Sequence, residues 1–133
     1  MALSKSNLGF PVVVGGATTT AVYTVSSAQK SYIRCILVHN VGIDAAGIST
    51  NIAQTARIYM VPNDGGSAGV ATVGNTVARL TLVPDDTVFF EPQYPFTLES
   101  NGDTIQVYNE GANGPTEAAN DIVVTVLGDK ESS

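Results

Sequence analysis

Apolar residues in this chain occur in short runs that are rich in β-branched and aromatic side chains and are bounded by Gly, Pro, Asn and Asp. Such runs are typical of strands. Eight segments follow this pattern: residues 21–25, 32–40, 56–61, 77–83, 87–91, 96–100, 104–109 and 121–127. No stretch of helical length keeps apolar residues at helical spacing behind a convincing cap. The pattern therefore predicts an all-β protein.

Most of these segments alternate apolar and polar residues, which gives each strand one buried face. Ile58 and Met60, for example, alternate with Arg57 and Tyr59. Because turn residues rather than helices connect the runs, the strands should be antiparallel. We predict a single antiparallel β-sandwich of about eight strands, jelly-roll-like in its order.

The two ends of the chain lack this alternation. We therefore expect an N-terminal arm over residues 1–15, the β-sandwich domain over 16–128 and a flexible C-terminal tail over 129–133. In an assembly protein, such an arm would be suited to extending over a neighbouring subunit and binding it.

Two turns in the pattern carry specific expectations. In the sequence SNGD, Asn101 and Gly102 tolerate positive φ, which predicts a tight hairpin between residues 96–100 and 104–109. The Gly-rich stretch after Pro62 has neither the Lys and helix of a phosphate-binding loop nor the distal Glu of an EF-hand calcium loop. We expect a wide turn there.

The segment 32–40 is apolar on both faces. Strict alternation places Ile33, Cys35 and Leu37 on one face and Ile36 and Val38 on the other. A strand that is apolar on both faces is buried on both, so either loops or another subunit must cover its outer face. The low charge of the chain favours a subunit.

Charge narrows the possible partners. The chain has 133 residues, of which 14% are charged, and 12 acidic against 6 basic residues give a net charge of -6. The cations are scattered along the sequence, whereas binding to nucleic acid requires clustered Lys and Arg. No apolar run has the length of a membrane-spanning helix. We expect no direct nucleic-acid partner and no membrane.

The sequence has little catalytic potential. His39 is the sole histidine, and Cys35 lies four residues away on the same strand, about 13 Å distant at 3.3 Å per residue, which is too far to share a metal ion. No G-x-S-x-G elbow is present, and Asp85 and Asp86 follow a proline as an ordinary turn. We expect no enzymatic activity, no metal and no cofactor, with Cys35 as a small core residue.

Aromatic residues supply the candidate contacts. Phe89 and Phe90 are adjacent, so one should face the core and the other solvent or a partner. The candidate interface residues are Phe10, Tyr32, Phe89, Phe90 and Tyr94. A sugar-binding platform is the alternative role for the aromatic segment 89–96.

The order of these motifs resembles small β-sandwich virion structural proteins of tailed bacteriophages. The similarity spans residues 20–127 and rests on AVYTV, SYIRCILVHNVG, ARIYMVPNDGGSAG, LTLVPDDTVFF and FTLESNGDTIQV. Members of this family decorate or cement capsids, or belong to necks, tails and fibres. The connections at 41–55 and 109–120 are longer than the family pattern, and we expect contacts particular to this protein there.

The resemblance implies a non-enzymatic virion protein that is assembled in the host cytoplasm. The first hypothesis is a capsid decoration or cement protein that stabilises the head, binds the major capsid protein or other virion proteins, and forms a homo-oligomer, expected to be a trimer. The alternative is a neck, tail or fibre component that contacts the host surface or its glycans.

Overall fold

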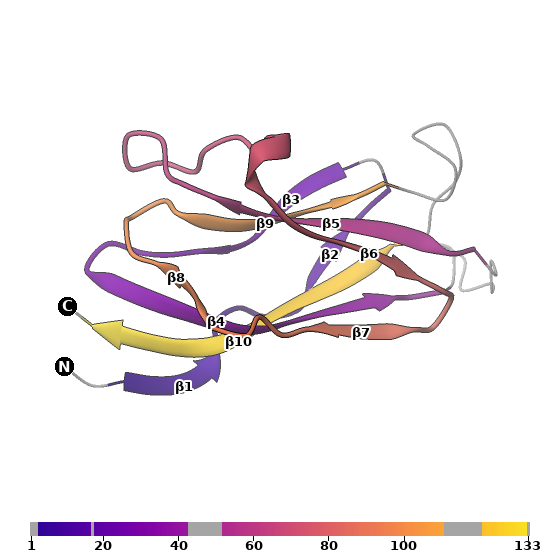
Figure 1. The fold of residues 1–133 in the computed structure, drawn as a ribbon, viewed down its shortest axis with the longest axis horizontal. Helices are drawn as coiled ribbons and strands as arrows, with labels where there is room; N and C mark the ends of the chain where they lie inside the picture. The colour runs from indigo at the N-terminus through magenta and orange to yellow at the C-terminus, as the bar shows by residue number, and fades with distance from the viewer. Residues whose placement is uncertain (1–2, 17, 43–51, 111–120, 133) are drawn as a thin grey trace.

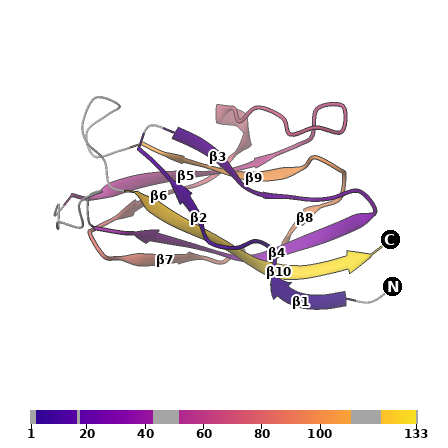
Figure 2. The same ribbon diagram turned by 180° about the vertical axis from the view of Figure 1, so that it is seen from behind.

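Two antiparallel sheets pack face to face in the computed structural model, which describes residues 3–16, 18–42, 52–110 and 121–132 (Figures 1 and 2). The strands in these residues are β1 (Leu3–Asn7), β2 (Val12–Val14), β3 (Thr18–Thr24), β4 (Gln29–Asn40), β5 (Gln54–Val61), β6 (Thr76–Leu82), β7 (Thr87–Phe90), β8 (Phe96–Leu98), β9 (Thr104–Asn109) and β10 (Ile122–Ser132). A short 3-10 helix, η1 (Val73–Asn75), precedes β6.

The first sheet has the order β1-β10-β4-β7, with β2 also paired to β10 and β8 also paired to β4. The second sheet has the order β3-β9-β5-β6. If β1 and β2 count as one interrupted strand, and β7 and β8 as another, each sheet has four positions. Every connection between these positions except that from β5 to β6 then crosses between sheets, as in a jelly roll. The predicted β-sandwich is confirmed, and its eight segments correspond to β3 through β10.

The ends of the chain differ from the sequence-based expectation. Strand β1 pairs antiparallel with the end of β10, from Leu3 opposite Glu131 to Asn7 opposite Leu127. Residues 3–7 and 127–131 therefore lie side by side in the first sheet, with β1 at its edge and β10 next to it, rather than as the expected arm and flexible tail (Figure 1). Pairing at an edge requires only backbone donors and acceptors, so β1 needs no apolar alternation to form.

A β-bulge interrupts the central pair of the first sheet. Cys35 lies opposite Leu127 and Ile33 lies opposite Gly128, so Arg34 has no partner across the strands. A Cβ atom at Gly128 would lie only 2.0 Å from the carbonyl oxygen of Tyr32. The bulge therefore depends on the close approach of two backbones that only glycine permits.

The bulge reverses which side chains of β4 face the core. Ile33, Ile36 and Val38 are all fully buried, whereas Cys35 and Leu37 lie on the outer face. The strict alternation expected for this strand placed Ile33 with Cys35 and Leu37, and that assignment is wrong because the extra residue shifts the register. One extra residue moves every later side chain to the opposite face.

Both edges of the first sheet are interrupted beside the bulge. Residues 8–11 separate β1 from β2, and residues 91–95 separate β7 from β8. Pro11 lies in the first gap, and Pro92 and Pro95 lie in the second. Proline cannot donate to a strand ladder, and a bulge increases local twist, so the edge strands break where the centre of the sheet bends.

The expected hairpin at SNGD does not form. Strand β8 pairs with β4 in the first sheet, whereas β9 pairs with β3 and β5 in the second, so the turn crosses between sheets. Of its central residues only Gly102 has positive φ, at 96°. Gly102 packs tightly on the backbone of Ser67, which directs the chain across the sandwich rather than back along β8.

Aliphatic side chains from the inner faces of both sheets form the core. The largest fully buried apolar side chains are Ile33, Ile36, Ile58, Leu82, Leu98, Ile105 and Ile122. Phe90 and Phe96 pack at its margin with ring centroids 5.9 Å apart. Burial of such side chains contributes about 1.5–3 kcal/mol each and is the main source of stability.

The bulge yields a prediction for Gly128→Ala. The new methyl group would collide with the Tyr32 carbonyl, so we expect the free energy of unfolding to fall by about 2–4 kcal/mol in urea denaturation. Gly74→Ala is the control, since the nearest atom to its Cβ would lie 3.8 Å away, and it should change stability by less than about 0.5 kcal/mol. Equal stability of the two variants would contradict this account of the bulge.

Candidate functional site: an uncovered apolar sheet face

The outer face of the first sheet carries apolar side chains from four neighbouring strands. The cross-strand register places Leu37 beside Phe89 and Thr125, and Cys35 beside Leu127. The open face is defined here by Val13, Cys35, Leu37, Phe89, Val123 and Leu127. These residues come together because the bulge turns Cys35 and Leu37 outward, onto the side of β4 away from the core.

No described residue covers the open face at its two edge strands, β2 and β7. Val13 on β2 is 59% exposed and Phe89 on β7 is 61% exposed. Cys35 and Leu37 on β4 between them are partly exposed. Of the two covers expected for this strand, loops among the described residues leave Val13 and Phe89 mostly exposed.

The remaining part of the same sheet face is polar, and its described charged side chains include an ion pair and a charged hydrogen bond. The Tyr32 hydroxyl donates a hydrogen bond to Glu131, and Arg34 forms an ion pair with the buried Asp129. The hydrogen bond to Glu131, together with burial and the nearby negative charge, raises the pKa of Tyr32. Lys30 lies opposite Glu131, so cationic and anionic residues are neighbours in this part of the face.

Cys35 and His39 both belong to the outer face of β4. Cys35 is half-buried there and not in the core as expected, and partial burial followed by the charge of Glu91 raises its pKa. His39 lies at the strand end, where its Nδ1 is 2.8 Å from the Thr87 hydroxyl. Within the described ranges, no three His, Cys, Asp or Glu side chains gather in a way that could hold a metal ion.

The five candidate interface residues do not form one patch. Tyr32 and Phe89 both lie on the outer face of the first sheet, whereas Phe90 points inward and packs against the core, as expected for adjacent residues on a strand. Phe10 and Tyr94, 87% and 77% exposed, lie in the two gaps that interrupt the edge strands. The expected contact segments at 41–55 and 109–120 fall mostly outside the described residues.

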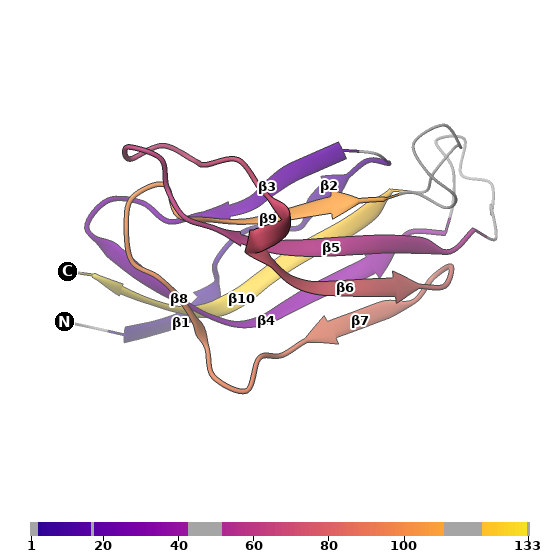
Figure 3. The ribbon, with the colours of Figure 1, turned by 45° about the horizontal axis from the view of Figure 1, so that its top comes forward.

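The outer face of the second sheet is partly covered by its own loop. Residues 62–75 fold back over it, and Gln106 Nε2 donates to the Gly69 carbonyl at 2.9 Å (Figure 3). Within the loop, Asp64 and Ser67 exchange two backbone hydrogen bonds while Gly65 and Gly66 adopt positive φ. The glycines of the expected wide turn therefore form a tight two-residue tip within the longer connection between β5 and β6.

The uncovered part of the second sheet carries a charged cluster that the sequence analysis missed. Arg57 and Arg79 lie directly opposite each other on β5 and β6. Both donate to the carboxylate of Glu110, with Nε distances of 2.9 Å and 2.7 Å, and Arg57 also lies over the Tyr108 ring. The hydrogen bond from Arg79 and then that from Arg57 lower the pKa of Glu110 despite its burial.

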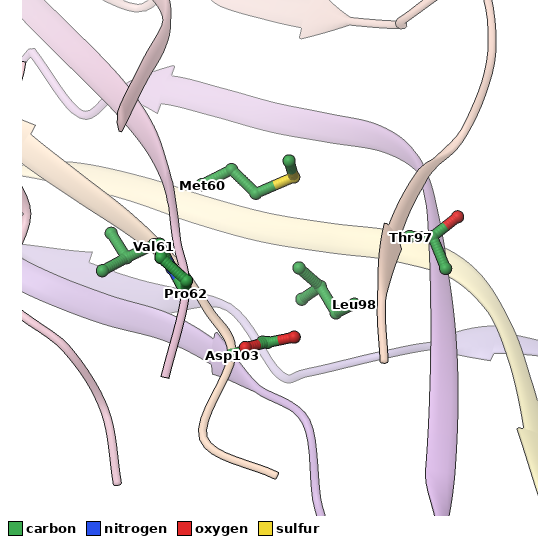
Figure 4. Close-up of a pocket in the computed structure, with 6 residues that line it drawn as sticks. All are labelled: Met60, Val61, Pro62, Thr97, Leu98 and Asp103. Carbon is green, nitrogen blue, oxygen red and sulfur yellow. The ribbon is translucent and has the colours of Figure 1, made fainter. Parts of the chain in front are cut away.

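A small cavity lies between the sheets at the end of the sandwich where β5 and β8 terminate (Figure 4). Its volume is about 260 Å³, and it is lined by Met60, Val61, Pro62, Thr97, Leu98 and Asp103. Asp103 at its margin is not free to act on a ligand, because its two oxygens accept hydrogen bonds from Asn63, Glu99 and Ser100. The cavity is therefore an apolar hollow with a structural carboxylate beside it.

Comparisons with known proteins identify no family. No family model and no curated protein matches the chain. Among solved structures, a protein of the disulfide-linked pili formed by Bacillus endospore appendages matches with a TM-score of 0.47 and 13% identity, over 98% of this chain and 88% of that chain. A chain of the nora virus structure matches with a TM-score of 0.35 and 12% identity, over 98% of this chain and 61% of that chain.

Among the described residues, no helix has the length and apolar character needed to cross a membrane.

The Asp103 network yields a prediction for Asp103→Asn. Burial alone would raise the pKa of Asp103, but the hydrogen bonds from Asn63, Ser100 and Glu99 outweigh it and hold the pKa below its usual range. A lowered pKa in the folded state stabilises the protein above pH 4 and less so as the pH falls further. We expect Asp103→Asn to lower the free energy of unfolding by about 1–3 kcal/mol at pH 7, with a smaller deficit below pH 4.

Asp64→Asn is the control for this experiment, because Asp64 is an exposed carboxylate in the neighbouring turn. It should leave the unfolding free energy nearly unchanged at both pH values. A pH-independent loss in Asp103→Asn, measured by urea denaturation, would show that the effect does not arise from the carboxylate charge.

Proposed function

We propose that this chain is a non-enzymatic structural protein of a virion, namely a capsid decoration or cement protein that assembles through the open face. The observation that carries the proposal is the apolar outer side of β2, β10, β4 and β7, with Phe89 and Val13 mostly exposed. A sheet face of this kind is stable in water when a second surface covers it.

The energetics of burial suit this role. A specific interface hides about 800 Å² per partner, and each square ångström of apolar surface removed from water contributes about 25 cal/mol. One such contact is modest once the cost of association is subtracted. Repeated at every position of a closed shell, the same contact holds many subunits at once and stabilises the whole shell.

Charge supports assembly through this face rather than elsewhere. The chain carries a net charge of -6, so identical copies repel each other over most of their surface. The six side chains that define the open face are uncharged, and in the polar part beside it Arg34 pairs with Asp129 and the Tyr32 hydroxyl with Glu131. Homo-oligomers, including the expected trimer, and the capsid surface can therefore approach it without placing like charges in contact.

Phe89→Lys tests self-association through the open face. The substitution places a charge on the most exposed side chain of the proposed contact, at its β7 edge, so we expect the oligomer to dissociate to monomers in analytical ultracentrifugation. Val73→Lys is the matched control, since Val73 is 85% exposed on η1 over the other sheet and the charge change is the same. A wild-type protein that is monomeric at high concentration, or equal oligomers in both variants, would refute the role of this face.

The number of copies per virion distinguishes a capsid decoration protein from a neck, tail or fibre component. For a decoration protein, quantitative mass spectrometry of purified particles should find an amount comparable to that of the major capsid protein. A small fraction of that amount would favour a neck, tail or fibre component, for which the 77% exposed Tyr94 would be the first residue to test in host adsorption. Absence from the particles would refute both.

A further inference from the structure

The charged cluster on the second sheet, formed by Arg57, Arg79 and Glu110, holds two guanidinium groups against one carboxylate. Like charges directly across a strand pair destabilise a sheet, and Glu110 offsets this repulsion by accepting two hydrogen bonds from each arginine. The net charge of the three side chains together is therefore +1. It is a local positive site on a chain whose net charge is -6.

Arg79 retains donors that the cluster does not use. A guanidinium has five N–H groups, and Arg79 gives one from Nε and one from Nη2 to Glu110. Its side chain is 60% exposed, so the other donors are open to a ligand. Arg57 is 37% exposed and lies over the Tyr108 ring, 5.9 Å from its centroid, which restricts the positions that its guanidinium can take. The two groups are therefore held in place before a ligand arrives.

Hydroxyl groups adjoin the arginines on the same outer face. Thr55 pairs with Thr81 two residues along from the Arg57–Arg79 pair, and Thr19 lies opposite Tyr108. Hydroxyls both donate and accept, which matches the hydroxyls of a sugar, and guanidinium groups match a carboxylate. The net charge of -6 disfavours a polyanion such as nucleic acid more strongly than a ligand with one carboxylate.

We propose that Arg57 and Arg79 bind the carboxylate of an acidic sugar, with the threonine hydroxyls of the same face contacting the sugar ring. This binding site is independent of the proposed assembly role, because it lies on the opposite sheet from the open face. Binding brings a second carboxylate to the two arginines and neutralises the cluster.

The experiment is a titration of the 15N-labelled protein with glucuronate at low salt, followed by NMR. We expect saturable shifts in the Nε–Hε signals of Arg57 and Arg79 and in the amides around them. Glucose, which has the ring hydroxyls but no carboxylate, should cause no such shifts. Acetate, which has the carboxylate alone, should bind at least several-fold more weakly than glucuronate. Equal affinity for acetate and glucuronate would overturn the assignment to a sugar.

Two substitutions test the arginines themselves. Arg79→Gln should raise the Kd for glucuronate about tenfold, the effect of losing one charge-assisted hydrogen-bonding partner. Lys30→Gln is the control, since it makes the same charge change on the exposed surface of the first sheet and should leave the Kd unchanged. Equal Kd values in these two variants, or no shift at the arginines in the wild type, would refute the site.

Glu110→Gln gives a third, opposite expectation. It raises the charge of the cluster from one to two positive charges, so glucuronate should bind several-fold more tightly. An amide spectrum close to that of the wild type would verify that the variant is folded. If the folded variant bound more weakly, the electrostatic basis of the proposal would be wrong.

Discussion

The pairing of β4 with β10, with its bulge at Arg34, is the constraint on which the first sheet depends. These two strands form its centre, and every other strand of that sheet pairs with one of them. The extra residue lets Ile33 and Ile36 both enter the core and turns Cys35 and Leu37 outward. The close contact of Gly128 with the Tyr32 backbone fixes this register, and the edge strands break at the same level.

Polar contacts across the sandwich then hold the two sheets in alignment. Near one end, the buried Asn40 of β4 donates to the Leu82 carbonyl of β6. Farther along, the buried hydroxyls of Tyr23 and Ser31 lie 2.6 Å apart and join β3 to β4. Because buried polar groups are costly unless they are hydrogen-bonded, these contacts favour one alignment of the sheets over others that would bury the same apolar area.

The outer faces of the two sheets expose different kinds of side chain. The outer side of the first sheet carries the apolar open face and, beside it, the paired polar side chains of Tyr32, Arg34, Asp129 and Glu131. The second sheet is partly covered by its own Gly-rich loop and elsewhere presents the charged cluster with threonine hydroxyls. Charged groups with unused hydrogen-bond donors remain stable in water, so this second face can stay exposed when the first is covered.

The sequence by itself determined the class of fold and most of its strands, because alternation of side chains and turn residues are local properties. It also indicated that β4 is apolar on both faces, and that one of Phe89 and Phe90 faces outward. Only the tertiary structure decided which residues of β4 those are, because a bulge arises from two strands distant in sequence and shifts the alternation. Pairing between strands that are distant in sequence likewise decided three other features: the partner of β1, the crossing at Gly102, and the cluster of Arg57, Arg79 and Glu110. Such pairing produces no periodic pattern in the sequence.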